Sequence, residues 1–154
     1  AREIARRQSE LEMGNERIER EVRSRTAQLR ESEERFRTIV ETANEGIWTA
    51  DRKGRTTFVN RRMAEMLGAG DEPLFGRHVT DFVFDENLEE AHDMITALME
   101  GLNIYQEFRF RQLNGNELWA LVGAAPLRDT AGNISGCMGV FADITQQRAD
   151  RAAL

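Results

Sequence analysis

The stretch from Ile134 to Thr145, which reads ISGCMGVFADIT, restricts the fold more than any other part of the chain. It is almost continuously apolar or small, as expected of a central strand that is buried on both faces. Alternation places Cys137, Gly139 and Phe141 on one face of this strand. A charged helical pattern follows at 146–154. A ligand that touches the middle of the strand could act on the helix beyond its end, which favours a sensor over an enzyme.

The length and composition suit one domain with a charged extension. The 154 residues exceed the roughly 100–120 of one such domain, and 31% of them are charged. The chain begins with Ala1, so we expect a fragment of a longer protein. The single Cys137 excludes an internal disulfide and fits a reducing compartment, so we predict a cytoplasmic protein. A net charge of −6 argues against nucleic-acid binding, and no apolar run reaches the ~18 residues of a membrane span.

Residues 1–36 have the composition of a long, solvated helix. They contain no proline, one glycine, nine basic and nine acidic residues, interspersed along the segment. Mixed charges of this kind are typical of a helix surface with ion pairs and not of a DNA-binding arm. A heptad frame fits the segment, and seven of its eleven core positions are apolar. These seven are Ile4, Leu11, Ile18, Val22, Leu29, Phe36 and Ile39.

The apolar stripe of this helix needs a partner, because an exposed stripe is costly on a single helix. We predict a parallel homodimer through the helix. Its seam would contain Ile4, Leu11, Ile18, Val22, Leu29 and Phe36. The other core positions are polar and would weaken the pair while helping to fix its register; they are Gln8, Asn15, Arg25 and Ser32. The alternative is a single helix whose stripe packs on its own domain.

The periodicity changes from helical to strand-like at Glu45. A hairpin and two helices are predicted next, at 46–60, 61–67 and 85–101. Asp85 is the predicted N-cap of the second helix, because an aspartate accepts hydrogen bonds from the first free N–H groups of a helix.

Three further strands complete the domain, and they are predicted at 104–113, 117–127 and 134–145. Turn signals separate them, so strands that follow one another in sequence are antiparallel neighbours. In the first of the three, Phe108 and Phe110 share one face. The order of elements predicts an α+β domain whose helices cover one face of an antiparallel sheet, with a cleft between the two layers.

The order and spacing of several short motifs resemble a PAS domain, the sensory module of many signalling proteins. The resemblance covers about residues 33–145. The motifs, in chain order, are SEERF at 32–36, GIW at 46–48, FVN at 58–60, Gly76-Arg77, Trp119 after an Asn-Gly turn, Pro126, Gly132 and Asp143-Ile144-Thr145. The segment before them is similar to the signalling helices that precede PAS domains in bacterial sensor kinases and cyclic-dinucleotide enzymes.

The resemblance implies a five-stranded antiparallel sheet with strand order 2-1-5-4-3 and a pocket between sheet and helices. It also implies homodimerisation and a covalently linked output domain, such as a histidine kinase or a diguanylate cyclase. The chain would divide into a signalling helix at 1–34, a sensory domain at 35–145 and the start of an output linker at 146–154. In the family the Asp143-Ile144-Thr145 motif is the hinge to the output, and we predict Thr145 as the N-cap of the exit helix.

Candidate pocket residues come from the end of the first hairpin, from the helices and from the inward faces of the later strands. They are Asn60, Met63, Met94, Phe108, Phe110, Cys137, Gly139 and Phe141. Methionine fills irregular gaps, so the two methionines suit either an adaptable pocket or a simple core. Trp48 and Trp119 are expected to pack on outer strands or at a dimer interface.

No flavin motif is complete. Phe141 stands where flavin-binding light sensors of the family use a glutamine, and phenylalanine cannot exchange hydrogen bonds with a flavin edge. Those proteins also need a reactive cysteine in the early helix, and 61–68 has none. A redox flavin held without an adduct is an alternative that would use the aromatic pocket and Asn60.

His92 is the candidate haem ligand. It lies in the predicted helix at 85–101, and oxygen-sensing haem PAS domains take their axial histidine from this same helix. Neutral imidazole ligates haem iron well. Ala91 and Ile95 set the apolar face of the helix and His92 lies next to that face, so a surface histidine is the alternative. His78 is expected to be exposed, and two distant histidines with one cysteine make no metal site.

The chain is therefore predicted to be a sensory module without a catalytic residue, because no nucleophile–base pair, phosphate loop or carboxylate pair can be assigned. Three hypotheses about its signal stay open. The first is a small ligand in the pocket. The second is a ligand-free dimerisation and relay module whose pocket is filled by phenylalanine and methionine side chains, and the residues favour it over any named cofactor. The third is a haem-based gas or redox sensor through His92.

Overall fold

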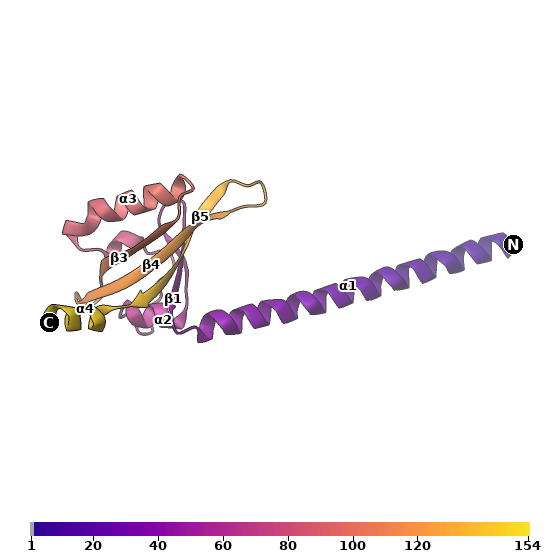
Figure 1. The fold of residues 1–154 in the computed structure, drawn as a ribbon. Helices are drawn as coiled ribbons and strands as arrows, with labels where there is room; N and C mark the ends of the chain where they lie inside the picture. Colours follow the sequence, from indigo (N-terminus) through magenta and orange to yellow (C-terminus); the bar gives the residue numbers. More distant parts are fainter. Residues whose placement is uncertain (1) are drawn as a thin grey trace. The chain divides into compact units, whose positions relative to one another are not determined.

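The computed structural model describes the backbone of residues 2–154 and the side chains of residues 5–39 and 43–154. The chain forms two compact units, residues 1–39 and residues 40–154. The first unit belongs to a single long helix, and the second holds a sheet with its own helices (Figure 1). No helix within residues 2–154 is both long and apolar enough to span a bilayer.

Helix α1 (Arg2–Thr42) forms from the segment that the heptad frame covers. Opposite charges one turn apart pair along its surface, as the mixed composition predicts. The pairs are Arg6–Glu10, Glu19–Arg23 and Glu31–Arg35. Exposed pairs of this kind contribute about 0.3–0.5 kcal/mol each, so the helix cannot depend on them alone.

Five antiparallel strands form the sheet of the second unit in the order β2-β1-β5-β4-β3. They are β1 (Gly46–Asp51), β2 (Thr56–Val59), β3 (Ile104–Arg111), β4 (Glu117–Arg128) and β5 (Ile134–Asp143). The predicted fold class, strand order and central last strand are confirmed. Strand β5 pairs with both β1 and β4, so it joins the first hairpin to the last two strands.

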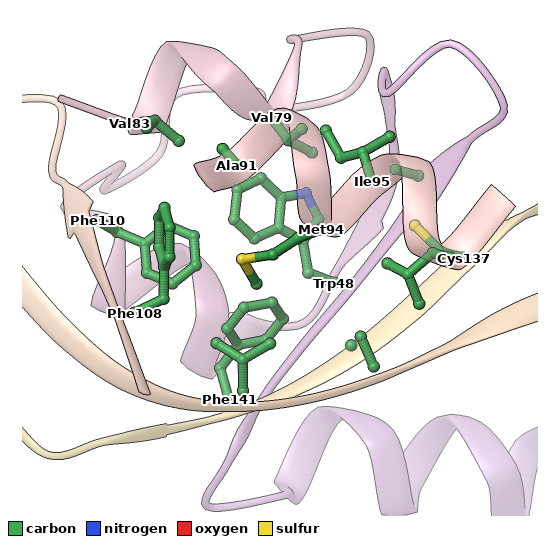
Figure 2. Close-up of a pocket in the computed structure, with 15 residues that line it drawn as sticks. Trp48, Val79, Val83, Ala91, Met94, Ile95, Phe108, Phe110, Cys137 and Phe141 are labelled. Carbon is green, nitrogen blue, oxygen red and sulfur yellow. The ribbon is translucent and has the colours of Figure 1, made fainter. Parts of the chain in front are cut away.

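Only one face of β5 is fully covered, which corrects the prediction of burial on both faces. Gly139 and Phe141 are buried, but Met138 on the opposite face is 38% exposed. The reason is that the helices between β2 and β3 pack on the face that carries Phe141, whose ring lies beside Met94 in Figure 2. Val140 and Ala142, which point the other way, are only half-buried.

Two α-helices and two short 3₁₀ turns connect β2 to β3. They are α2 (Arg61–Met66), η1 (Val79–Phe82), η2 (Asp85–Asn87) and α3 (Leu88–Met99). The predicted N-cap Asp85 is wrong, because residues 85–87 turn as a 3₁₀ helix and α3 begins only after Asn87. Gly101 ends α3 as predicted: its φ is +93° and Leu102 N donates to Ala97 O across it at 3.0 Å.

The core lies between the sheet and these helices and is rich in aromatic rings. Trp48, Phe82, Phe108, Phe110 and Phe141 contact one another with ring centroids 4.8–6.1 Å apart. Tilted and edge-on contacts of this kind add to the stabilisation from burial. Trp48 is 4% exposed on the inner strand β1, so the expectation of an outer-strand position is wrong for this residue.

Candidate ligand cavity and signal exit

An apolar cavity of about 90 Å³ lies between the inward face of the sheet and α3. Figure 2 shows Met94 reaching from α3 into the space between Trp48 and Phe141. The lining residues are Trp48, Ala50, Val79, Val83, Ala91, Met94, Ile95, Leu98, Phe108, Phe110, Val122, Ala124, Cys137, Gly139 and Phe141. Strands β1, β3, β4 and β5 contribute alternate residues, because only every second side chain of a strand faces the helices.

The structure brings six of the eight predicted pocket residues together around this cavity. They are Met94, Phe108, Phe110, Cys137, Gly139 and Phe141. Asn60 and Met63 are not among the lining residues. Met63 is fully buried against β1, where a Cβ on Gly46 would lie 2.6 Å from its sulfur. Its role is therefore close packing of α2 on the sheet.

Asn60 is a structural connector and not a pocket residue. Its Oδ1 accepts from Ile47 N and from Met63 N, each at 2.9 Å, and its Nδ2 donates to Glu45 O at 3.1 Å. It is the N-cap of α2 and is 1% exposed. The side chain thus ties the start of β1 to the first turn of α2, which explains a buried amide without any ligand.

The pocket prediction missed the β1 and β4 residues Trp48, Ala50, Val122 and Ala124. Period-two alternation along both strands was available as a signal. Alternation shows which residues share a face of the strand, but it does not show which of the two faces meets the helices. That depends on β1 being an inner strand, next to β5.

The cavity offers almost no polar group to a ligand. Trp48 Nε1 already donates to Thr56 Oγ1 at 2.9 Å. Burial raises the pKa of the Cys137 thiol, so its thiolate is disfavoured and the cysteine behaves as an apolar lining residue. Among the described side chains, those of residues 5–39 and 43–154, there is also no group of three or more His, Cys, Asp or Glu that could hold a metal ion.

Neither histidine lines the cavity. His92 is exposed on α3. His78 is half-buried, which corrects the expectation of an exposed residue: its Nδ1 lies 2.7 Å from Thr80 Oγ1 and its Nε2 lies 2.8 Å from Lys53 O. Ligand pockets usually measure roughly 300–1,000 Å³. A cavity of about 90 Å³ with His92 outside it does not fit haem, and it does not fit flavin.

The end of β5 passes directly into helix α4 (Thr145–Ala153) and is held there by Trp119 of β4. Ile144 N donates to Trp119 O at 2.9 Å, which continues the strand pairing by one bond. Trp119 N then donates to Thr145 Oγ1 at 3.0 Å. In a regular antiparallel pair, Trp119 N would donate to the carbonyl of Ile144. That carbonyl instead accepts from Arg148 N inside α4, and the Thr145 hydroxyl takes its place. Thr145 therefore closes the last pair of the sheet.

This geometry corrects the prediction that Thr145 is the N-cap of the exit helix. The N-cap is Ile144, and Asp143 supplies the side chain that accepts a helical N–H, from Thr145 N at 3.0 Å. Thr145 uses its hydroxyl on β4. The three residues of the predicted hinge thus act together: Asp143 accepts the helical N–H, Ile144 is the N-cap and Thr145 bonds to β4.

Side chains of α4 also contact the outward face of the sheet. The Arg148 guanidinium lies over the Trp119 ring with its Cζ 3.5 Å from the ring centroid. Arg148 and Arg151 both donate to the carboxylate of Glu107 on β3, at 2.5 and 3.3 Å. The Arg148 hydrogen bond, followed by that of Arg151, lowers the pKa of Glu107. We call Glu107, Trp119, Arg148 and Arg151 the exit clamp.

Comparison with protein families identifies the second unit. The PAS fold family matches residues 34–144. A C4-dicarboxylate transport sensor protein from Rhodobacter capsulatus is 34% identical over 115 residues, which make up 73% of this chain and 18% of that protein. A probable diguanylate cyclase from Escherichia coli is 28% identical over 112 residues, 71% of this chain and 10% of the cyclase. The chain spans less than a fifth of the length of these relatives.

Solved structures agree on the fold. A PAS domain from Colwellia psychrerythraea superposes with a TM-score of 0.67 at 19% identity, covering 73% of this chain and 97% of that one. The PAS domain of an HTR-like protein from Haloarcula marismortui gives a TM-score of 0.66 at 19% identity, covering 79% and 99%. With a family match over residues 34–144 and this fold, the chain belongs to the PAS family of sensory domains, which also occur in histidine kinases and in a diguanylate cyclase.

Proposed function

We propose that this chain is a cytoplasmic relay module that dimerises through α1 and passes a signal to a covalently linked effector such as a histidine kinase or a diguanylate cyclase. Residues 1–34 act as the signalling helix, 35–145 as the sensory domain and 146–154 as the start of the output linker. The module performs no catalysis itself. The signal is a change in the cavity or a rotation that arrives through α1.

One observation carries the proposal: β5 is a single strand that lines the cavity and then becomes the exit helix. Phe141 faces the cavity, and Asp143 caps α4 two residues later. A shift of the strand at Phe141 therefore changes the pairing of Ile144 and Thr145 with Trp119. The exit clamp converts such a shift into a change in the angle of α4. Two arrangements that differ by only a few kcal/mol suffice for a relay of this kind.

A stripe of exposed apolar side chains on α1 supports the dimer. Its members Leu11, Ile18, Val22, Leu29 and Phe36 are 57–70% exposed. At 3.6 residues per turn they fall within about 40° of one another around the helix axis. Ile4, the first residue of the predicted seam, lies outside the described side chains. Burying one such side chain is worth about 1.5–3 kcal/mol, so a parallel second copy of the helix is the natural cover.

The dimer is tested by light scattering after size-exclusion chromatography. The chain should elute with twice its monomer mass, and Leu29→Lys should produce a monomer. Ala27→Lys, which places the same charge off the stripe, is the matched control and should stay dimeric. A monomeric unmodified chain at micromolar concentration would remove the dimer from the proposal.

The hinge is tested in the full-length parent protein by the activity of its effector. Asp143→Ala should change either the basal output or its response to the stimulus, because Thr145 N loses its cap. Output that stays unchanged under every stimulus would contradict the hinge.

A ligand-free relay is the second candidate function, and it is favoured by a cavity of only about 90 Å³ that Met94 partly fills. A haem sensor through His92 has no such support.

A further inference from the structure

We propose that the cavity binds a small, uncharged, apolar molecule of roughly benzene size or less, an inference that rests on the proposed sensory function and specifies its ligand. The relevant molecules are hydrocarbons or apolar gases that enter without making a hydrogen bond. Three features of the cavity lead to this class: its lining, its volume and its contact with β5.

The lining excludes ligands that carry charge or need hydrogen bonds. The hetero atoms among the lining side chains are those of Trp48, Met94 and Cys137. The indole N–H is already used by Thr56, and the two sulfurs are weak partners. Among the described residues no buried side-chain nitrogen or oxygen lacks a hydrogen-bond partner, so nothing in the core awaits a polar ligand. A polar group placed here would lose its water without compensation.

The volume sets the size of the ligand. Apolar cavities of about 150 Å³ stay dry and bind benzene or xenon. The present cavity measures about 90 Å³, which is large enough for xenon and requires a small adjustment for benzene. Met94 can supply that adjustment, because it is only half-buried and its thioether chain has three rotatable bonds. Figure 2 shows its side chain in the middle of the space that a ligand would enter.

The contact with β5 makes occupancy detectable by the relay. A Cβ on Gly139 would lie 2.6 Å from the ring of Phe141, so the ring lies against the glycine backbone and has no room to retreat into the strand. A molecule that enters beside the ring must therefore displace Met94 or move the strand itself. The strand reaches Asp143 two residues after Phe141.

The proposal is tested by ¹³C-methyl NMR of the whole 154-residue chain with benzene, xenon gas and phenol as probes. Benzene and xenon should shift the methyl signals of Val79, Val83 and Ile95. Phenol should bind about tenfold more weakly than benzene or worse, because its hydroxyl finds no partner. Binding of xenon alone supports the apolar class and points to a gas, whereas binding of both points to a hydrocarbon.

Two matched variants locate the site. Ala124→Leu fills the cavity and should weaken benzene binding at least about tenfold, since the added side chain takes up the ligand's volume. Ala125→Leu makes the same change at the next residue of β4, which faces away from the cavity, and should leave binding unchanged. If Ala124→Leu does not fold, Ala91→Val fills the cavity from α3 instead.

The inference is overturned if neither benzene at saturation nor xenon under pressure shifts these methyl signals, or if phenol binds as well as benzene. A purified protein that carries haem or flavin would overturn it too. These failures differ from failure of the relay. If the probes do not bind but Asp143→Ala still changes effector output, only the ligand class is wrong. If the probes bind and hinge variants leave output unchanged, the relay is wrong.

Discussion

The hydroxyl of Thr145 offers a sharp test of how the exit helix is attached to the sheet. Thr145→Val keeps the shape of the side chain and removes the acceptor that Trp119 N uses at 3.0 Å. An unpaired, fully buried donor costs about 1–3 kcal/mol. Trp119 is only half-buried, so we expect the lower end, about 1 kcal/mol. This corresponds to a roughly fivefold change in a local opening equilibrium.

Hydrogen exchange of the Trp119 amide measures this cost directly. In Thr145→Val the amide should exchange about fivefold faster than in the unmodified chain. The Leu121 amide, whose backbone faces β5 as that of Trp119 does and lies inside the regular β4–β5 ladder, serves as the internal reference. Thr145→Ser keeps the hydroxyl and should restore most of the protection. Equal exchange rates in the valine and serine variants would refute the assignment of the hydroxyl as the acceptor.

Three other predictions concern the connector Asn60, the glycine that ends α3 and the exit clamp. Asn60→Ala should lower the free energy of unfolding, measured by urea titration, by about 3 kcal/mol, because three hydrogen bonds of a buried side chain are lost. The control Asn133→Ala, on an exposed turn, should change it by less than about 0.5 kcal/mol. Gly101→Ala should destabilise the folded chain by about 1 kcal/mol, because the φ of Gly101 is +93°. Gly14→Ala, inside α1 and with open space around it, should raise helicity or leave stability unchanged. Melting followed by circular dichroism separates the two variants, and a Gly101→Ala variant as stable as the unmodified chain would contradict the role of this φ. Because Arg148 and Arg151 lower the folded-state pKa of Glu107, the clamp is complete above the unfolded pKa, about 4.3, and is lost as the pH falls through the folded value. The protection factors of the α4 amides, which are exchange rates corrected for the intrinsic pH dependence of exchange, should therefore fall in the unmodified chain as the pH drops through the folded-state pKa of Glu107, whereas Glu107→Gln should already show low protection at neutral pH and little further change.

Local patterns predicted the elements and the directions of most side chains. Alternation correctly placed Phe108 and Phe110 on one face, and Cys137, Gly139 and Phe141 on another strand's inward face. These are statements about a strand and its own periodicity, so they need no knowledge of neighbours. The charged pairs of α1 are similarly local, since they lie one turn apart.

Two of the errors, those at Asn60 and Thr145, arose where a side chain's partner is distant in sequence. The sequence suggested that Asn60 lines the pocket, but in the structure its side chain hydrogen-bonds to the backbone of Glu45, Ile47 and Met63. The sequence suggested that Thr145 caps the exit helix, but in the structure its hydroxyl accepts a hydrogen bond from the backbone N–H of Trp119, twenty-six residues earlier. In both cases a short polar side chain had several local partners available. The partner it uses depends on which backbone groups the fold leaves unpaired nearby.

The amino-acid sequence by itself determined the long N-terminal helix, the five strands and the helix that follows the last strand. It did so because periodicity and turn residues act over a few positions. It also determined the central place of the last strand, through the resemblance to a family. Only the tertiary structure decided that the pocket is small and without polar groups, that Trp48 lines it and that His92 does not. Cavity volume is what remains after side chains from six elements have packed together, and no single segment carries that quantity. The attachment of α4 through Trp119 and Glu107 was decided in the same way, by groups on two other strands.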